Sequence, residues 1–164
     1  MYNKKIFFRS IFFLALFATL SLIGWWVYDR YFAHTLYVDS EHHCRIDIRP
    51  SFNYQNAEVT KAIEIVKQNS PEYYEKLCSY VAIIDSTNSC DSRSTACAYG
   101  GNKIGINKNN YVNTEKLAGV LVHETCHFHQ GHTATPESYI NFDLDSNESE
   151  CYSEEDKFLN IIDE

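Results

Sequence analysis

Two histidines four residues apart enclose a glutamate in the segment His123-Glu124-Thr125-Cys126-His127, which matches the pattern HExxH. Residues four apart lie on one face of an α-helix, so both imidazoles could bind a single metal ion. A neutral imidazole pair suits zinc, and a catalytic zinc needs a third protein ligand and a site for water. The segment therefore predicts a zinc site with Glu124 as general base. Histidines that only face solvent, or a zinc site without catalysis, are the alternatives.

The third ligand must come from outside this segment, and two regions could supply it. The longer pattern HExxHxxGxxH would require glycine at 130 and histidine at 133, but the sequence has Gln130 and Thr133. His132 is displaced from that pattern by one position, which rotates a helical side chain by about 100°, and it is therefore a secondary candidate. The C-terminal region offers Glu150 and Glu154, which are four residues apart.

The HExxH segment followed by this ExxxE pair resembles the gluzincins, the thermolysin-like group of zinc metallopeptidases. The resemblance covers about residues 99–158 and implies a helix-rich zincin domain that hydrolyses peptide bonds. It also implies that Glu150 is the third zinc ligand and that Glu154 orients His123 from behind. Glu148 competes with Glu150 for the ligand role, although it lies two helical positions away.

The cysteines favour disulfides. The chain has six of them, all beyond residue 31, and none is spaced as CxxC, which disfavours a thioredoxin-type redox site and a zinc ribbon. In an oxidising compartment, an even number of cysteines with this spacing favours disulfides. Proximity favours a pairing of Cys90 with Cys97. Cys126 and Cys151 each adjoin a proposed zinc ligand, so a disulfide would join the two metal-bearing helices; a free thiolate beside zinc is the alternative.

Apolar periodicity predicts the elements that position these groups. Leu117, Val120, Leu121 and Phe128 recur at helical spacing around the HExxH segment. Short β-rich runs alternate with such helical patterns, which indicates a helix-rich α+β fold with a small sheet. The expected helices cover 55–69, 71–78, a stretch from Asn113 or Thr114 to a stop at Gly131, and 147–162; the expected strands cover 45–48, 81–84 and 103–107.

One strand and several side chains are candidates for substrate contacts. The strand expected at 103–107 alternates in character and is predicted to lie at the edge of the sheet, where an extended peptide would add to it. The polar stretch 85–97 is predicted to be a loop. A further hydrogen-bond donor should stabilise the oxyanion of the reaction. His132, His129, Tyr139 and Tyr152 are possible donors.

The chain begins with a basic and then apolar segment. Residues 11–28 contain no charged side chain, and about 20 apolar residues suffice to span the hydrocarbon layer. The basic residues before this run would keep the N-terminus in the cytoplasm. The segment predicts a cytoplasmic end at 1–10, a transmembrane signal-anchor at 11–31 and an extracytoplasmic domain, periplasmic or extracellular, at 32–164. A cleaved signal peptide is the alternative.

The formal net charge of −8 over 164 residues is unevenly distributed. The first 30 residues contribute +3, and the remainder contributes −11. Because an acidic body repels phosphate backbones, we expect no nucleic-acid partner. The leading hypothesis is a membrane-anchored zinc metallopeptidase that acts on a peptide or protein substrate. An exported binding or assembly module, stabilised by zinc but without activity, is the other.

Overall fold

The computed structural model divides into two units, residues 1–33 and 34–164. It describes residues 4–31, 35–49, 56–87, 90, 94–107, 110, 112–131 and 144–163. The first unit contains the helix α1 (Lys4–Tyr31). Within these described ranges no helix combines the length and the apolar character that a membrane crossing requires, so the transmembrane span expected at 11–31 is not supported.

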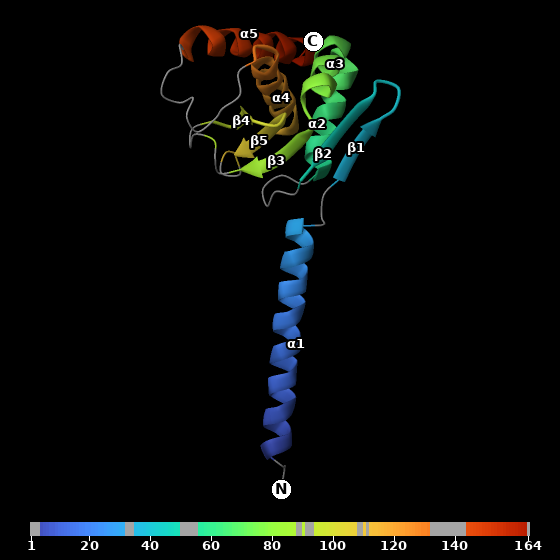
Figure 1. The fold of residues 1–164 in the computed structure, drawn as a ribbon, viewed down its shortest axis with the longest axis vertical. Helices are drawn as coiled ribbons and strands as arrows, with labels where there is room; N and C mark the ends of the chain where they lie inside the picture. Colours follow the sequence, from blue (N-terminus) through green and yellow to red (C-terminus); the bar gives the residue numbers. More distant parts are fainter. Residues whose placement is uncertain are drawn as a thin grey trace. The chain divides into compact units, whose positions relative to one another are not determined.

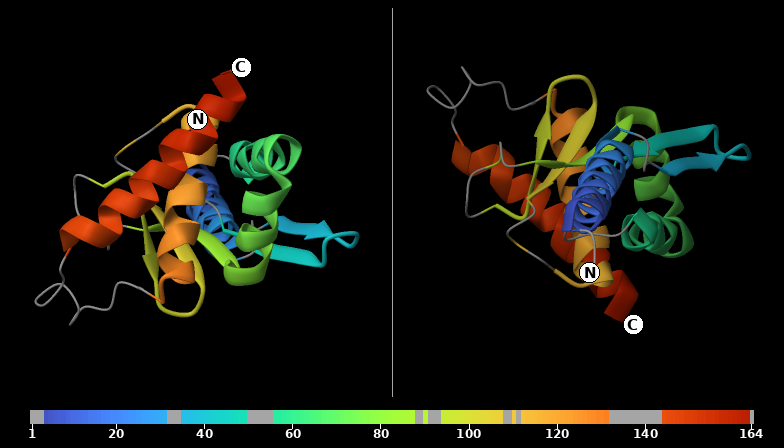
Figure 2. Two further views of the ribbon diagram at one scale, coloured as in Figure 1. Left: turned by 90° about the horizontal axis from the view of Figure 1, so that it is seen from above. Right: turned by 90° about the horizontal axis from the view of Figure 1, so that it is seen from below.

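The second unit is an α+β domain, as predicted, in which helices cover one face of a small mixed sheet (Figure 1). Helices α2, α3 and α4 pack against the sheet, and α5 lies across α4 on the side away from the strands (Figure 2). The helices are α2 (Asn56–Asn69), α3 (Pro71–Tyr80), α4 (Thr114–His129) and α5 (Leu144–Asp163); the strands are β1 (Thr35–Asp39), β2 (Cys44–Ile48), β3 (Ile83–Thr87), β4 (Ala96–Tyr99) and β5 (Lys103–Asn107).

The strands are ordered β1-β2-β3-β5-β4. Strands β2, β3 and β5 run parallel, whereas β1 and β4 pair antiparallel with their neighbours at the two edges. Strand β5 pairs with β3 on one side and β4 on the other, so the prediction that 103–107 forms an edge was wrong. The edge on this side of the sheet is β4. Its four residues follow a polar stretch, and their apolar alternation is too short to be recognised as a strand.

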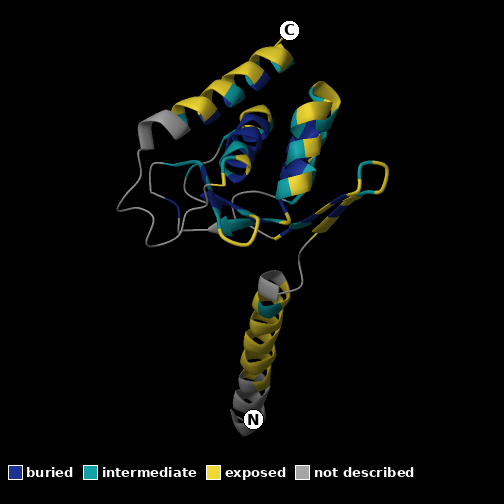
Figure 3. Cartoon of the chain, turned by 45° about the horizontal axis from the view of Figure 1, so that its top comes forward, coloured by how far each residue is buried: buried dark blue, intermediate teal, exposed yellow. Residues whose placement is uncertain are grey.

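The core lies between the sheet and the helices that cover it (Figure 3). Ile46 and Ile104 from the strands, and Ile63 and Leu121 from the helices, have no exposed surface. Helix α4 is buried on nearly all sides because it lies between the sheet and α5, and residues 117–125 are all buried. The helix that carries the HExxH segment is therefore the central element of the domain.

Both ends of α4 follow from local sequence signals. Asn113 caps the N-terminus, because its Oδ1 accepts a hydrogen bond of 2.8 Å from the backbone N–H of Lys116. Glu115 in the first turn interacts favourably with the helix dipole. At the other end the chain turns at Gly131, whose φ of 73° is one that glycine adopts without strain. The predicted start and stop of this helix are confirmed.

Three disulfides join the six cysteines. The predicted pairs Cys90–Cys97 and Cys126–Cys151 are both formed, and the third disulfide is Cys44–Cys78. Cys44–Cys78 links β2 to α3, and Cys126–Cys151 links α4 to α5. Each of these two bridges restricts the unfolded chain as well as joining two packed elements, so both should stabilise the fold.

A hydrogen-bond network attaches the β1–β2 hairpin to helices α2 and α3. Asp39 Oδ2 lies 2.8 Å from Lys67 Nζ, accepts a bond of 2.8 Å from the Tyr74 hydroxyl and lies 2.9 Å from His42 Nδ1. The Tyr74 hydroxyl also lies 2.9 Å from that of Tyr37. Lys67, together with Tyr74, holds the pKa of Asp39 well below its usual range. The Asp39 carboxylate is therefore fully engaged in holding the hairpin.

We expect Asp39→Asn to destabilise the domain by an amount that depends on pH. The carboxylate contributes stability above its unfolded pKa of about 3.9, and this contribution is lost as the pH falls through the lowered folded pKa. The difference between wild type and variant in urea unfolding, measured with chelator present, should be constant from about pH 7 to 5 and shrink below about pH 4. Glu41→Gln, at an exposed neighbour, is the control. A difference that stays constant down to pH 3 would contradict this assignment.

Candidate metal centre

His123 and His127 of α4 present their imidazoles to one point. The two Nε2 atoms lie 3.1 Å apart, and the ring centroids are 4.9 Å apart. This approach follows from the four-residue spacing, which stacks both side chains on one face of the helix. Two ring nitrogens this close need a shared proton or a shared cation between them. The pair predicted from the sequence is therefore formed.

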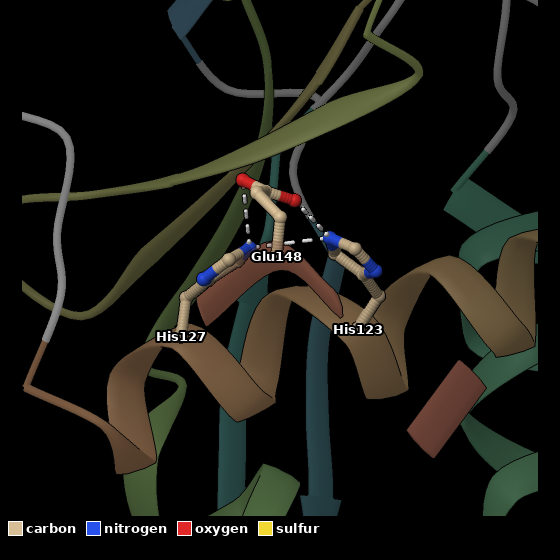
Figure 4. Close-up of side chains that lie close together, drawn as sticks. All are labelled: His123, His127 and Glu148. Carbon is tan, nitrogen blue, oxygen red and sulfur yellow. Dashed lines mark hydrogen bonds and ion pairs between the residues drawn. The ribbon is translucent and has the colours of Figure 1, made fainter. Parts of the chain in front are cut away.

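Glu148 of α5 completes a group of three (Figure 4). Its Oε2 lies 3.4 Å from His123 Nε2, and its Oε1 lies 3.5 Å from His127 Nε2. The carboxylate faces both imidazoles, as the close-up shows. All three ligand atoms fall within 4.8 Å of one another, so the group could hold a metal ion. Two neutral nitrogens and one carboxylate oxygen are a donor set that suits a divalent cation.

Glu150 and Glu154, which the resemblance assigned to the metal site, lie elsewhere. Glu150 accepts a hydrogen bond of 2.7 Å from the side-chain amide of Gln130, and Glu154 pairs with Lys157 at 2.8 Å. The reason is the rotational phase of α5, since two positions along a helix turn a side chain by about 200°. The structure thus brings Glu148 to the histidines in the place where Glu150 was expected.

Glu155 takes the supporting position that was expected for Glu154. Its Oε2 lies 3.3 Å from Nδ1 of His123, and its Oε1 lies 2.8 Å from Lys116 Nζ. A carboxylate at this position favours a proton on Nδ1, which leaves the lone pair of Nε2 directed at the centre of the group. Glu148 and Glu155 are seven residues apart, two turns along one face of α5.

Glu124 lies beside the group and is buried. Its carboxylate accepts a hydrogen bond from the backbone of Ala98 in the edge strand β4. Burial raises the pKa of Glu124 to about 7, against the lowering influence of His123 and of Ala98. The charges of Glu148 and Glu155 raise it further. Three acidic side chains thus surround His123, an arrangement that a bound cation would relieve electrostatically.

The four residues predicted as possible oxyanion donors differ in whether they lie near the metal group. The Tyr152 ring lies 4.5 Å from that of His123, centroid to centroid, although the side chain is 57% exposed. His129 is instead held by Tyr80, whose hydroxyl lies 3.1 Å from its Nδ1. His132 and Tyr139 lie outside the described residues. Among the described residues that were proposed as donors, Tyr152 is the one at the metal group.

The Cys126–Cys151 disulfide joins the two helices at the site itself. Cys126 precedes His127 on α4, and Cys151 lies one turn after Glu148 on α5. Its sulfur lies 3.7 Å from Nδ1 of His127, so the bridge packs directly behind that imidazole. The disulfide therefore limits how far Glu148 can move from the two histidines.

Comparisons with known proteins leave the family open. No protein-family model matches the chain, and neither the curated proteins nor the solved structures give a match.

Proposed function

We propose that this protein is a zinc metallopeptidase whose ion is held by His123, His127 and Glu148. The observation that carries the proposal is the donor triangle of these three side chains: the two Nε2 atoms lie 3.1 Å apart, and the Glu148 carboxylate places Oε2 3.4 Å from one and Oε1 3.5 Å from the other. Ligands about 2.0–2.1 Å from a tetrahedral zinc lie about 3.3 Å from one another. One ligand atom from each of the three side chains can therefore take a corner of such a site, and the described residues place no fourth ligand there, so a water could take the remaining corner, as catalysis requires.

The roles of the protein groups follow from their positions. A zinc ion held there would supply a Lewis acid that polarises a substrate carbonyl and makes a neighbouring water more acidic. Glu124 would take the proton of that water and pass it to the leaving amine, because it adjoins His123 and is shielded from solvent. The phenol of Tyr152, beside His123, would donate to the oxyanion.

The substrate would lie along β4. This strand forms an edge of the sheet, and its residue Ala98 hydrogen-bonds Glu124. An extended peptide that adds to an edge strand pairs with its backbone, which would bring one peptide bond beside Glu124. The same mode of binding was expected for residues 103–107, but these pair with β3 and β4 inside the sheet, so we propose it for β4.

The three disulfides support an extracytoplasmic location. All six cysteines are paired, and disulfides persist in oxidising compartments such as the periplasm or the extracellular space. We therefore propose that the domain works outside the cytoplasm, where the disulfide between α4 and α5 keeps the metal site assembled.

Removal of zinc should abolish hydrolysis by the wild-type protein. We expect about one zinc per chain by metal analysis, cleavage of a library of internally quenched peptides, loss of cleavage with 1,10-phenanthroline, and recovery when zinc is restored, because the proposed reaction depends on the ion held by the three ligands. The non-chelating isomer 1,7-phenanthroline is the control. A protein that binds zinc but cleaves no member of the library would instead be the zinc-stabilised binding or assembly module.

A further inference from the structure

Three positions on one face of α4 lie beside Glu155. Lys116, Gly119 and His123 are three and four residues apart, so they share that face. The two oxygens of Glu155 divide between the outer positions: Oε1 lies 2.8 Å from Lys116 Nζ and Oε2 lies 3.3 Å from His123 Nδ1. A single carboxylate therefore connects an ammonium group with the outer nitrogen of a metal-site histidine.

Gly119 leaves room for side chains of α5 to pack closely on α4. A Cβ atom at this position would lie 3.3 Å from Cγ of Glu155 and 2.9 Å from Cδ2 of Leu159. A side chain at 119 would therefore force Leu159 to shift and would crowd the stem of Glu155. Glycine is a poor helix former, and its presence here is explained by the side chain of Leu159 and the stem of Glu155, which pack over it.

The burial of the three groups differs in a way that assigns their roles. The side chain of Glu155 is 6% exposed and that of His123 is 8% exposed, whereas that of Lys116 is 49% exposed. A buried carboxylate needs ionic or hydrogen-bond partners. Lys116 reaches in from the surface and supplies the shorter of the two contacts. Without it, one oxygen of Glu155 would lose its charged partner, and the carboxylate would be less firmly directed at His123.

We propose that Lys116 is a positioning residue of the metal site, which holds Glu155 so that this carboxylate orients His123 toward the ion. This inference rests on the metal site of the proposed function but not on peptide hydrolysis. Lys116 touches neither the donor triangle nor the substrate strand in the described contacts, so its effect passes through Glu155 and the His123 ring. The connection consists of the Lys116–Glu155 ion pair and the contact of Glu155 with His123 Nδ1, in series across the α4–α5 contact.

The chain supplies a matched control pair. Lys157 and Glu154 also lie 2.8 Å apart, on α5, and their side chains are 62% and 24% exposed. This pair has the same chemistry and the same separation as Lys116 and Glu155, but Glu154 makes no described contact with a metal-site histidine. Lys157→Met therefore removes an equivalent surface charge without acting on His123.

The test is a double-mutant cycle on zinc affinity, measured by competition with a chromophoric chelator. Glu155→Ala should weaken zinc binding by about 10–100-fold, which is typical for loss of an outer partner of a ligand histidine. Lys116→Met should weaken it by about tenfold in the wild-type background and by less than about twofold in the Glu155→Ala background. Lys116→Arg should restore most of the affinity, and Lys157→Met should leave it unchanged.

Two further measurements separate positioning from general destabilisation. The cobalt-substituted Lys116→Met protein should show an altered visible absorption spectrum, because the direction of the His123 ring affects the ligand field, whereas Lys157→Met should not. Thermal melts with chelator present report the stability of the fold itself. A Lys116→Met variant that melts lower but keeps wild-type zinc affinity and cobalt spectrum would overturn the proposal.

Other outcomes also decide the matter. Equal loss of affinity from Lys116→Met with and without Glu155 would show that the lysine acts by another route, which overturns the proposal. Wild-type protein that binds no zinc would overturn this inference and the proposed function together. Zinc binding with the expected cycle, but without hydrolysis of any peptide, would overturn the peptidase function alone.

Discussion

Glu124→Gln should reduce kcat/KM for peptide hydrolysis by about 10²–10⁴-fold, the usual contribution of a general base, while zinc remains bound at about one ion per chain. Glutamine has the same shape and still accepts the hydrogen bond from the backbone of Ala98, so the local structure should be kept. What it loses is the capacity to take and return a proton. Paired measurements of zinc content and of hydrolysis of an internally quenched peptide give the result.

The control for this variant is Glu115→Gln, an exposed glutamate in the first turn of the same helix. Folding is checked separately. Because burial raises the pKa of Glu124 to about 7, above its value in the unfolded chain, its ionisation at pH 8 lowers the stability of the folded protein, and a neutral glutamine avoids that cost. The variant with chelator present should therefore melt no lower than wild type. Equal hydrolysis by both proteins would remove Glu124 from the mechanism.

The central helix was the part of the fold most accessible from the sequence. Leu117 and Leu121 mark a buried face by spacing alone, Asn113 is a strong capping residue, and Gly131 marks the end. These are local signals, and the structure bears them out. The two histidines inherit their geometry from that helix, so their approach could be predicted without knowledge of any tertiary contact.

The third ligand depended on the rotation of one helix against another, which no local signal fixes. The pattern ExxxE drew attention to Glu150, on the face of α5 that contacts Gln130 rather than the histidines. The predicted Cys126–Cys151 disulfide does indicate which face of α5 is turned toward α4. A cysteine of α5 that is bonded to α4 must face α4. Glu148, three residues before Cys151, and Glu155, four residues after it, lie on that same face of α5, whereas Glu150, the residue next to Cys151, does not.

The edge of the sheet was harder to predict for a related reason. Residues 103–107 alternate and read as an edge strand, yet Gly105 pairs with Asp85 on one side and with Cys97 on the other. Strand β1 was likewise not among the predicted strands. Strand order is a property of contacts distant in sequence, and short strands such as β4 contribute too few residues for a recognisable alternation.

Glu148→Ala should weaken zinc binding by more than about 100-fold, because loss of a direct ligand exceeds the 10–100-fold effect of losing an outer partner. The carboxylate lies 3.4 and 3.5 Å from the two Nε2 atoms, and its removal leaves two imidazoles to hold the ion. Competition with a chromophoric chelator measures the change. The Glu148 side chain is 37% exposed, so its truncation should leave no cavity in the core, and a melt with chelator present should show a fold as stable as wild type.

Glu150→Ala provides the comparison that decides between the two glutamates. It lies on the same helix and is exposed, and its described partner is the amide of Gln130, so zinc affinity should change by less than about threefold. A larger loss from Glu150→Ala than from Glu148→Ala would restore the ligand assignment that the ExxxE pair implied and would require α5 to be turned relative to α4. That rotation would in turn have to break the contact between Glu155 and His123 and strain the Cys126–Cys151 bridge. If Glu150→Ala gave this result, Glu155→Ala should no longer lower the zinc affinity.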